Sequence, residues 1–216
     1  GTNFSVYTTQ EPSKYRSLNI SFQDPMINDS PYLVGASIFY SFRGSSTNYY
    51  FPLDFTVGGA VASFGRRLEW PDDFFRVMWS TKFMQKEYEG SQSDIDNYIG
   101  GLQKTRGISL SQVLSRDSRN RAEFPTNGST FILENTYSGG FLGGNENFQK
   151  HMLTLDWFTP TFSKFVLYNS VKLGVIKTID VGDDVQSFVP FDERFIMGGN
   201  GIPYGNALRL SLIHIS

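Results

Sequence analysis

Alternation of apolar and polar residues over many short stretches constrains the fold of this chain more than any other feature. Val34, Ala36, Ile38, Tyr40 and Phe42 recur at every second position, with Gly and Ser among the residues between them. Successive side chains of a β-strand point to opposite faces, so such a stretch has one apolar and one more polar face. Helical spacing is hard to find in the sequence, and the pattern therefore predicts an all-β protein.

The alternation defines about nine strands. No repeat of fixed period and no Pro/Ser-rich linker interrupts them, so we expect a single structural unit. Two strands are weakly defined, because the first is short and the sixth contains Lys104, Arg106 and Gly107. The predicted strands lie near residues 3–8, 14–22, 32–43, 56–68, 74–86, 99–115, 129–137, 148–158 and 164–176.

Two kinds of connection take turns between these strands. Pro-bearing turns occupy residues 23–31, 70–73 and 159–163, whereas polar or Gly-rich loops occupy 87–98 and 138–147. Every second connection of an antiparallel meander lies at the same end of the sheet. We therefore expect an antiparallel meander with compact turns at one end and looser loops at the other.

The composition favours a transmembrane β-barrel and leaves a soluble β-sandwich as the alternative. Aromatic residues make up 16% of the 216 residues and charged residues only 19%, which suits strands with one lipid-facing side. A sandwich also alternates and also carries turn residues. Aromatic residues stand near strand ends, as in the interfacial girdles of barrels: Trp70, Phe74, Phe75, Trp157, Phe158, Phe162 and Phe165.

Composition also excludes several classes of protein. The absence of cysteine excludes a disulfide framework and thiol catalysis. No apolar run approaches the ~18 residues of a membrane-spanning helix. The net charge of -2 gives no electrostatic reason to expect nucleic-acid binding. The many aromatic residues exclude a disordered chain.

Three segments carry a more specific signal. They are residues 124–129, which read Phe-Pro-Thr-Asn-Gly-Ser, residues 149–160, and residues 190–201 followed closely by Arg209. In this order and spacing they resemble the barrel of the Omp85 superfamily, the bacterial surface antigen D15 domain. The resemblance implies a partial transmembrane β-barrel with about nine of about 16 strands.

The resemblance also divides the chain. We expect residues 1–209 to form the partial barrel, which would not close by itself. Residues 210–216 do not resemble the continuation of the family barrel, and we expect them to be a non-native tail. The resemblance thus implies that the natural protein continues beyond this chain.

Functional residues follow from the same resemblance. In the family a long extracellular loop folds back into the barrel lumen, and its tip carries an Arg that contacts acidic groups of the wall. Phe195, Gly198 and Gly199 match the approach to that tip and Arg209 matches its Arg, although Leu210 stands where Gly is expected. The turn motif of the family is matched by Phe124, Pro125, Thr126 and Gly128.

The function that the resemblance implies is not enzymatic. It is the insertion of nascent β-barrel proteins into the outer membrane of Gram-negative cells. The implied partners are the outer-membrane lipid bilayer, nascent outer-membrane β-barrel proteins and accessory periplasmic assembly lipoproteins, with no nucleic acid and no cofactor. Other Omp85 translocators, of the two-partner secretion or Tam type, share this barrel and stay open as alternatives, as does a passive porin-like channel.

No catalytic or metal-binding constellation emerges from the sequence. His151 stands on the apolar face of a predicted strand, so we interpret it as a lipid- or interface-facing residue rather than a general base. Asp180, Asp183 and Asp184 lack the spacing of a calcium-binding loop, and we expect a solvated loop there.

Two further motifs have structural interpretations. The Gly-rich stretch 139–144 is not followed by a predicted helix, so we expect a flexible loop rather than a phosphate-binding one. Arg116, Arg119 and Arg121 form a charged cluster at one strand end, which predicts local ion pairs or a contact surface for partner subunits.

Overall fold

The structure is a computed structural model that describes residues 2–11, 15–27, 30–45, 52–99, 101–182, 189–190, 193–197 and 205–206. Nine of its strands form one sheet. They are β1 (Asn3–Glu11), β2 (Tyr15–Asp24), β3 (Tyr32–Arg43), β4 (Asp54–Arg67), β5 (Phe75–Glu89), β6 (Lys104–Asp117), β7 (Gly128–Ser138), β8 (Phe148–Pro160) and β9 (Val166–Thr178). The other elements are helix α1 (Gln92–Ile99), a 3-10 turn at Gly140–Leu142, and the short strands β10 (Ile196–Met197) and β11 (Gly205–Asn206).

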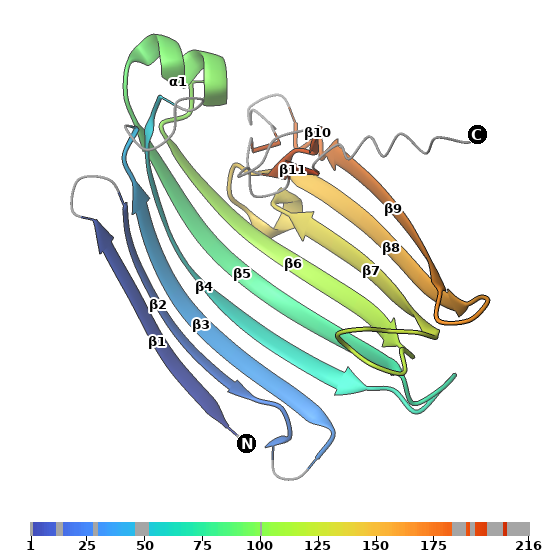
Figure 1. Ribbon diagram of the computed structural model, residues 1–216. Coiled ribbons are helices and arrows are strands. Elements are labelled where there is room, and N and C mark those ends of the chain that lie inside the picture. The colour runs from blue at the N-terminus through green and yellow to red at the C-terminus, as the bar shows by residue number, and fades with distance from the viewer. Residues whose placement is uncertain are drawn as a thin grey trace, which may run out of the picture.

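The sheet is an antiparallel meander, in which strands that follow each other along the chain lie side by side (Figure 1). This confirms the predicted fold class. The strands are 9 to 15 residues long, and a tilted strand of ~9–11 residues crosses a bilayer. Within the part of the chain that the structure describes, the sheet is not closed, and β1 and β9 are its edges.

The two ends of the sheet differ as the sequence predicts. One end, here named the turn end, carries the connections 25–31, 68–74, 118–127 and 161–165. The opposite end, here named the loop end, carries the connections 44–53, 90–103 and 139–147, the second of which contains α1 (Figure 1).

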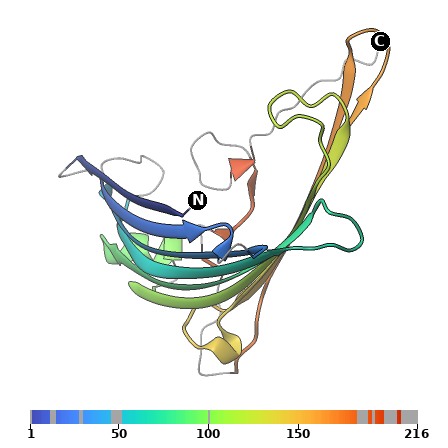
Figure 2. The same cartoon turned by 90° about the horizontal axis from the view of Figure 1, so that it is seen from below.

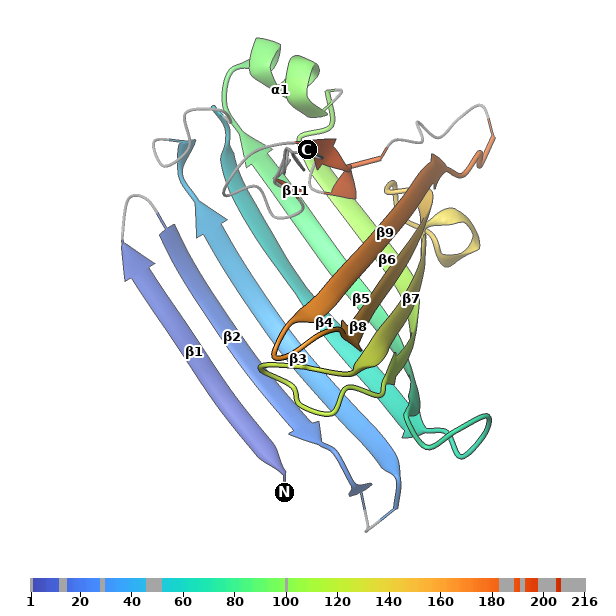
Figure 3. The ribbon, with the colours of Figure 1, turned by 45° about the vertical axis from the view of Figure 1, so that its right-hand side comes forward.

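The sheet is strongly curved rather than flat. Seen from below, it forms a trough, and β10 lies on the concave side (Figure 2). A second view shows β8 and β9 curling forward over the other strands (Figure 3). We name the concave side the inner face and the convex side the outer face.

Apolar side chains form a continuous band on the outer face. Ile20 of β2 pairs with Ile38 of β3, and Ala60 of β4 pairs with Phe83 of β5. The full row across six strands contains Val6, Ile20, Ile38, Ala60, Phe83 and Ile108. A second row across four strands consists of Leu114, Leu133, Leu153 and Leu173.

The opposite face of the same strands is far more polar. Ser5 and Ser21 lie there with their hydroxyl oxygens 2.7 Å apart. Phe158 belongs to this face, where its ring stacks on Tyr168 at a centroid distance of 4.9 Å. The expectation that Phe158 joins an outer aromatic girdle is therefore wrong, because its position in the alternation points it inward.

Helix α1 corrects the predicted loop at 87–98 and the predicted start of the sixth strand at residue 99. The Ser91 hydroxyl accepts a hydrogen bond from the Asp94 amide at 3.2 Å, which caps the first turn. Ile95 and Ile99, one turn apart, are buried against Leu53 and Tyr88. Burial of this short apolar stripe favours a helix over residues 92–99. Residue 99 is therefore helical, and β6 begins only at Lys104. No helix of the described ranges is long and apolar enough to cross a membrane.

Candidate functional site on the inner face

The loop between β7 and β8 closes over the inner face near the loop end. β6 pairs with β7 from Ser109 to Asp117. Nearer the loop end, β6 contacts the loop instead, through a β-bridge between Gly107 and Gly144. The Asn145 amide donates to the Arg106 carbonyl at 2.9 Å, and the Arg106 amide donates to the Asn145 side chain at 2.7 Å. The loop thus takes the place of β7 as the hydrogen-bonding neighbour of β6 at this end of the sheet.

The loop's Gly-rich first half is also held by hydrogen bonds. The Gly139 amide donates to the Ile108 carbonyl at 3.0 Å, and the Gly140 amide donates to the Asn147 side-chain oxygen at 2.7 Å. Both glycines have positive φ, which other residues rarely adopt. The expected flexible loop is therefore an anchored one, because its glycines permit the backbone to turn back onto β6.

A buried ion pair lies beneath this loop. The Lys86 ammonium is 3.1 Å from Glu146 Oε1, and the two side chains are 1% and 2% exposed. The Thr105 hydroxyl donates to the same Glu146 oxygen at 2.7 Å. Gly107 provides the room, since a Cβ there would stand 2.8 Å from Glu146 Oε2. The pair therefore joins the loop to β5 and β6 inside the sheet.

A second anchor holds the segment that includes residues 193–195. The Lys150 ammonium of β8 donates to the Glu193 carboxylate at 3.0 Å and to the Glu193 carbonyl at 3.1 Å. Lys82 of β5 lies 3.9 Å from the other Glu193 oxygen. The segment thus bridges two strands that are not neighbours in the sheet.

Phe195 packs beside this anchor. The Lys150 ammonium lies 5.3 Å from the centre of the Phe195 ring, a cation–π distance. The ring lies against Gly174 of β9, where a Cβ would come within 2.5 Å of Phe195 Cζ. The Phe195 ring therefore occupies space that a side chain at position 174 would fill.

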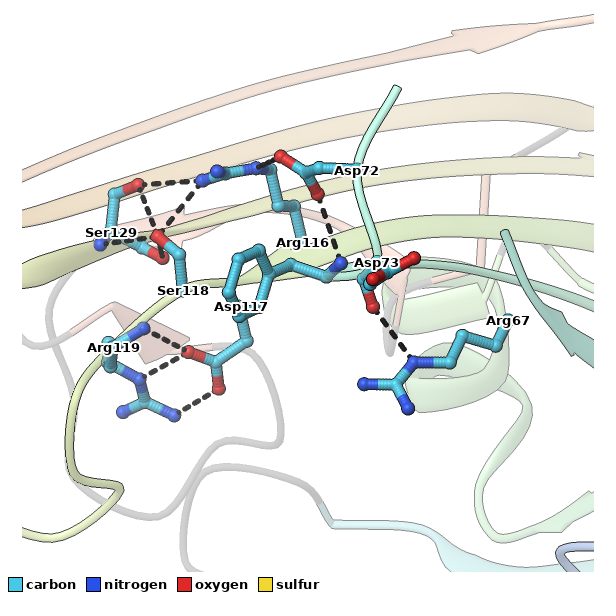
Figure 4. A network of polar contacts seen from close by, with 9 residues as sticks. Arg67, Asp72, Asp73, Arg116, Asp117, Ser118, Arg119 and Ser129 are labelled. Carbon is cyan, nitrogen blue, oxygen red and sulfur yellow. Dashed lines mark hydrogen bonds and ion pairs between the residues drawn. The ribbon is translucent and has the colours of Figure 1, made fainter. Parts of the chain in front are cut away.

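The turn end carries a second polar network (Figure 4). Arg116 Nε donates to Asp72 at 2.8 Å, which joins the β4–β5 turn to β6. Arg116 Nη1 donates to the Ser118 and Ser129 hydroxyls at 3.0 and 3.2 Å. Its guanidinium also lies 5.5 Å from the centre of the Phe74 ring.

Arg119 completes this network from the following turn. Its Nη2 donates to Asp117 at 2.7 Å, and this hydrogen bond raises the pKa of Arg119 above its ordinary value. Arg121 enters no such network among the residues that the structure describes, so the local ion pairs that we expected involve only Arg116 and Arg119 of the three arginines.

The predicted turn motif lies beside this network. Asn120 accepts hydrogen bonds from the Thr126 and Asn127 amides at 3.0 and 3.2 Å, so it shapes the turn that contains Pro125. Gly128 has φ +105°, and a Cβ there would meet the Ser118 carbonyl oxygen at 2.3 Å. Phe124 is 79% exposed at the tip.

The remaining predicted residues are only partly described. Phe195 lies on the inner face, whereas Gly198, Gly199 and Arg209 are outside the described residues, as are residues 210–216. The Asp180 carboxylate accepts a hydrogen bond from the Gly182 amide at 3.1 Å, and Asp183 and Asp184 are not described.

His151 stands on the outer face, where we expected it. Its Nδ1 lies 2.8 Å from the Asn135 side-chain oxygen, and Asn135 donates weakly to Gln112 at 3.5 Å. These three polar residues share one row across β6, β7 and β8. Across the described ranges, no group of three His, Cys, Asp or Glu side chains is arranged to hold a metal ion.

Sequence reasoning missed the four charged residues of the two anchors. Lys86 and Glu146 stand on a predicted strand and in a predicted loop without any motif that marks them. Lys150 and Glu193 lie within the segments 149–160 and 190–201, but nothing in those segments singles them out. The available signal is the position of Lys86 and Lys150 in the alternation, which points both side chains to the polar face. Their acidic partners follow only from the folding of two loops onto that face.

The arrangement as a whole is a curved wall with an apolar outer band and a polar inner face that binds two segments of its own chain. A sequence model described as the Omp85 superfamily domain matches residues 1–209. Over 195 residues the chain is 28% identical to the curated outer membrane protein assembly factor BamA of Nitratidesulfovibrio vulgaris, a match covering 86% of this chain and 22% of that protein.

A solved structure has the same fold. The chain is similar to the crystal structure of BamA from Haemophilus ducreyi lacking POTRA domains 1–3, with a TM-score of 0.74 and 16% sequence identity. The similarity covers 93% of this chain and 39% of that one. The chain therefore spans well under half the length of the relatives that it matches.

Proposed function

The chain belongs to the Omp85 superfamily, and we propose that it is part of the barrel of an outer-membrane protein assembly factor related to BamA. Proteins of this family reside in the outer membrane of Gram-negative bacteria. The observation that carries the proposal is the similarity to a curated assembly factor over 86% of the chain. The apolar outer band and polar inner face support a position within the bilayer.

The proposed activity needs no bond chemistry. A client barrel gains free energy when its strands pair their backbone groups and bury apolar side chains in lipid. An assembly factor would lower the barrier to that process, so we propose a protein that is not an enzyme and uses no cofactor or nucleotide. Nascent β-barrel proteins would be its clients, and accessory periplasmic lipoproteins its partners.

The whole protein would supply what the described sheet lacks. β1 and β9 are open edges, and in lipid each unpaired backbone group costs several kcal/mol. We propose that further strands of the protein, to a total of about 16, pair with these edges. In this proposal residues 1–209 are barrel, and 210–216 are a non-native tail.

The segment around Phe195 supports one further part of the proposal. Glu193 and Phe195 are anchored on the inner face through Lys150 and Gly174. We propose that the chain beyond them continues through the lumen, with Gly198 and Gly199 allowing close backbone approach and Arg209 contacting acidic groups of the wall.

The test is a folding assay in lipid vesicles. The full-length protein is reconstituted, and a urea-unfolded outer-membrane β-barrel protein is added. Acceleration of its folding over protein-free vesicles, read as a heat-modifiable band on gels, is the expected result. Ion conductance without acceleration would favour the porin-like channel instead, and export of a cognate soluble protein would favour a two-partner secretion or Tam-type translocator.

A further inference from the structure

Two arginines stand directly opposite each other on the inner face at the turn end. Arg67 of β4 pairs with Arg76 of β5 in the sheet register. Residues in such a pair have Cβ atoms about 4.5–5.5 Å apart, and like charges at that spacing destabilise a sheet. The pair therefore works against the stability of the sheet that carries it.

Two other arginines at this end, Arg116 and Arg119, are already neutralised (Figure 4). Arg119 Nε and Nη2 donate to the two carboxylate oxygens of Asp117 at 2.9 and 2.7 Å. Arg116 Nε pairs with Asp72 at 2.8 Å. Both cations thus have a carboxylate of their own.

Arg67 and Arg76 keep most of their hydrogen-bond donors. Arg67 donates through Nε to the Asp73 carbonyl at 2.8 Å, and no dashed line reaches its two terminal nitrogens in Figure 4. No hydrogen bond or ion pair joins Arg76 to a residue that the structure describes, although Asp117 lies near enough to feel its charge. Among the described residues, neither arginine therefore has a carboxylate at ion-pair distance, although the Asp117 carboxylate that Arg119 binds lines the same space.

A hollow of about 350 Å³ opens between these side chains. Ser115 and Thr130 contribute polar lining, and Ile132 contributes an apolar wall. The alternation of their strands points these three residues to the inner face. The hollow therefore faces the lumen rather than the bilayer, at the end of the barrel where short turns face the periplasm.

We propose that Arg67 and Arg76 form a binding site for the carboxylates of an acidic peptide segment that enters the barrel from the turn end. Guanidinium groups bind carboxylates through two parallel hydrogen bonds, and two adjacent groups present a matched row of donors. Lipid phosphates are disfavoured as ligands because both arginines project away from the outer face. The site does not depend on which Omp85 activity the protein has.

The experiment measures binding of a fluorescent hexaglutamate peptide to the full-length protein in detergent micelles by anisotropy. Arg67→Gln combined with Arg76→Gln should weaken binding about tenfold, the loss expected for charge-assisted hydrogen bonds at an exposed site. Arg66→Gln is the matched control. Arg66 is the neighbour of Arg67 at the same depth, but it projects to the outer face over the Tyr32 ring.

A hexaglutamine peptide should not bind, and the unfolding midpoint of Arg76→Gln should equal or exceed that of the wild-type protein because like-charge repulsion is relieved. The proposal is overturned if Arg66→Gln weakens binding as much as the double variant, since net charge alone would then explain the affinity. It is also overturned if the double variant binds hexaglutamate normally, or if Arg76→Gln destabilises the fold, which would mark Arg76 as a structural partner of Asp117.

Discussion

Removal of the Lys86 charge offers the sharpest test of how the inner face is held together. Lys86→Met keeps the apolar stem and leaves the Glu146 carboxylate, 2% exposed, without its cation. Loss of one partner of a buried pair costs about 3–5 kcal/mol, because the remaining charge stays out of water. The Thr105 hydroxyl, which still donates to Glu146, offsets only part of that cost.

Uptake of a proton by the stranded carboxylate sets an upper limit on the cost. An ordinary glutamic acid ionises near pH 4.3, and each pH unit above that corresponds to about 1.36 kcal/mol. At pH 7 the limit is therefore about 3.7 kcal/mol, and at pH 5 it is about 1 kcal/mol. The folded variant would hold a proton that the unfolded chain releases, so its stability falls as the pH rises.

The assay is guanidinium unfolding of the full-length protein in micelles, followed by tryptophan fluorescence at several pH values. The free energy of unfolding of the wild-type protein should exceed that of the variant by an amount that increases from pH 5 to pH 7, within the limits of about 1 and about 3.7 kcal/mol. Adding Glu146→Gln to Lys86→Met removes the titrating group and should make the difference independent of pH.

Lys104→Met is the matched control, because Lys104 pairs with Glu87 at 2.8 Å while the two side chains are 50% and 43% exposed. Such a pair contributes at most about 1 kcal/mol. A loss below about 1 kcal/mol for Lys86→Met at pH 7, or a loss that does not change with pH, would refute the reasoning.

Three further substitutions probe the turn end and the contact between Phe195 and Gly174. Gly128→Ala forces a left-handed backbone and a Cβ clash with a carbonyl oxygen, so urea unfolding should show a loss of about 1–3 kcal/mol. Gly174→Ala should displace Phe195 and speed hydrogen exchange in its segment, whereas Gly58→Ala, whose Cβ would meet atoms at 3.7 Å, should not. Arg116→Met, which cuts a partly exposed link between two turns, should lower stability by about 1 kcal/mol and leave Phe195 exchange unchanged.

Most of the sheet was predictable because two local rules act together. Alternation assigns each side chain to a face, and the inner and outer rows follow once neighbouring strands pair in register. The Pro-bearing turn at Trp70 to Asp73 and the Gly-rich loop before Asn147 then place the two kinds of connection at opposite ends. None of these inferences needs a contact between distant parts of the chain.

Helix α1 was missed although its signals are local. Ser91 with Asp94 three residues later is a capping pattern, and Ile95 with Ile99 gives a single apolar turn. One turn is too short for a periodic signal to stand out from a polar loop. The helix forms because Leu53 and Tyr88 offer an apolar surface, which is a tertiary effect.

The two ion-pair anchors of the inner face could not be predicted from local sequence rules, because they too depend on tertiary contacts. Alternation points Lys86 and Lys150 inward, but a polar lumen filled with water would explain them equally well. Their partners Glu146 and Glu193 reach them only after two loops fold back. Gly107 and Gly174 show why the fold-back is possible, since each leaves space for the side chain above it.

The two ends of the inner face then differ in a way that follows from solvation. Near the loop end, Lys86 and Lys150 are buried and each has a carboxylate within 3.1 Å, because an unpaired charge out of water would cost several kcal/mol. At the turn end, Arg67 and Arg76 stand exposed and side by side, which water and salt make tolerable. A surface whose charges are buried and paired attracts a second molecule only weakly, whereas an exposed surface that carries two adjacent arginines attracts anions. If this wall receives segments of other proteins, the charge distribution therefore favours entry from the turn end.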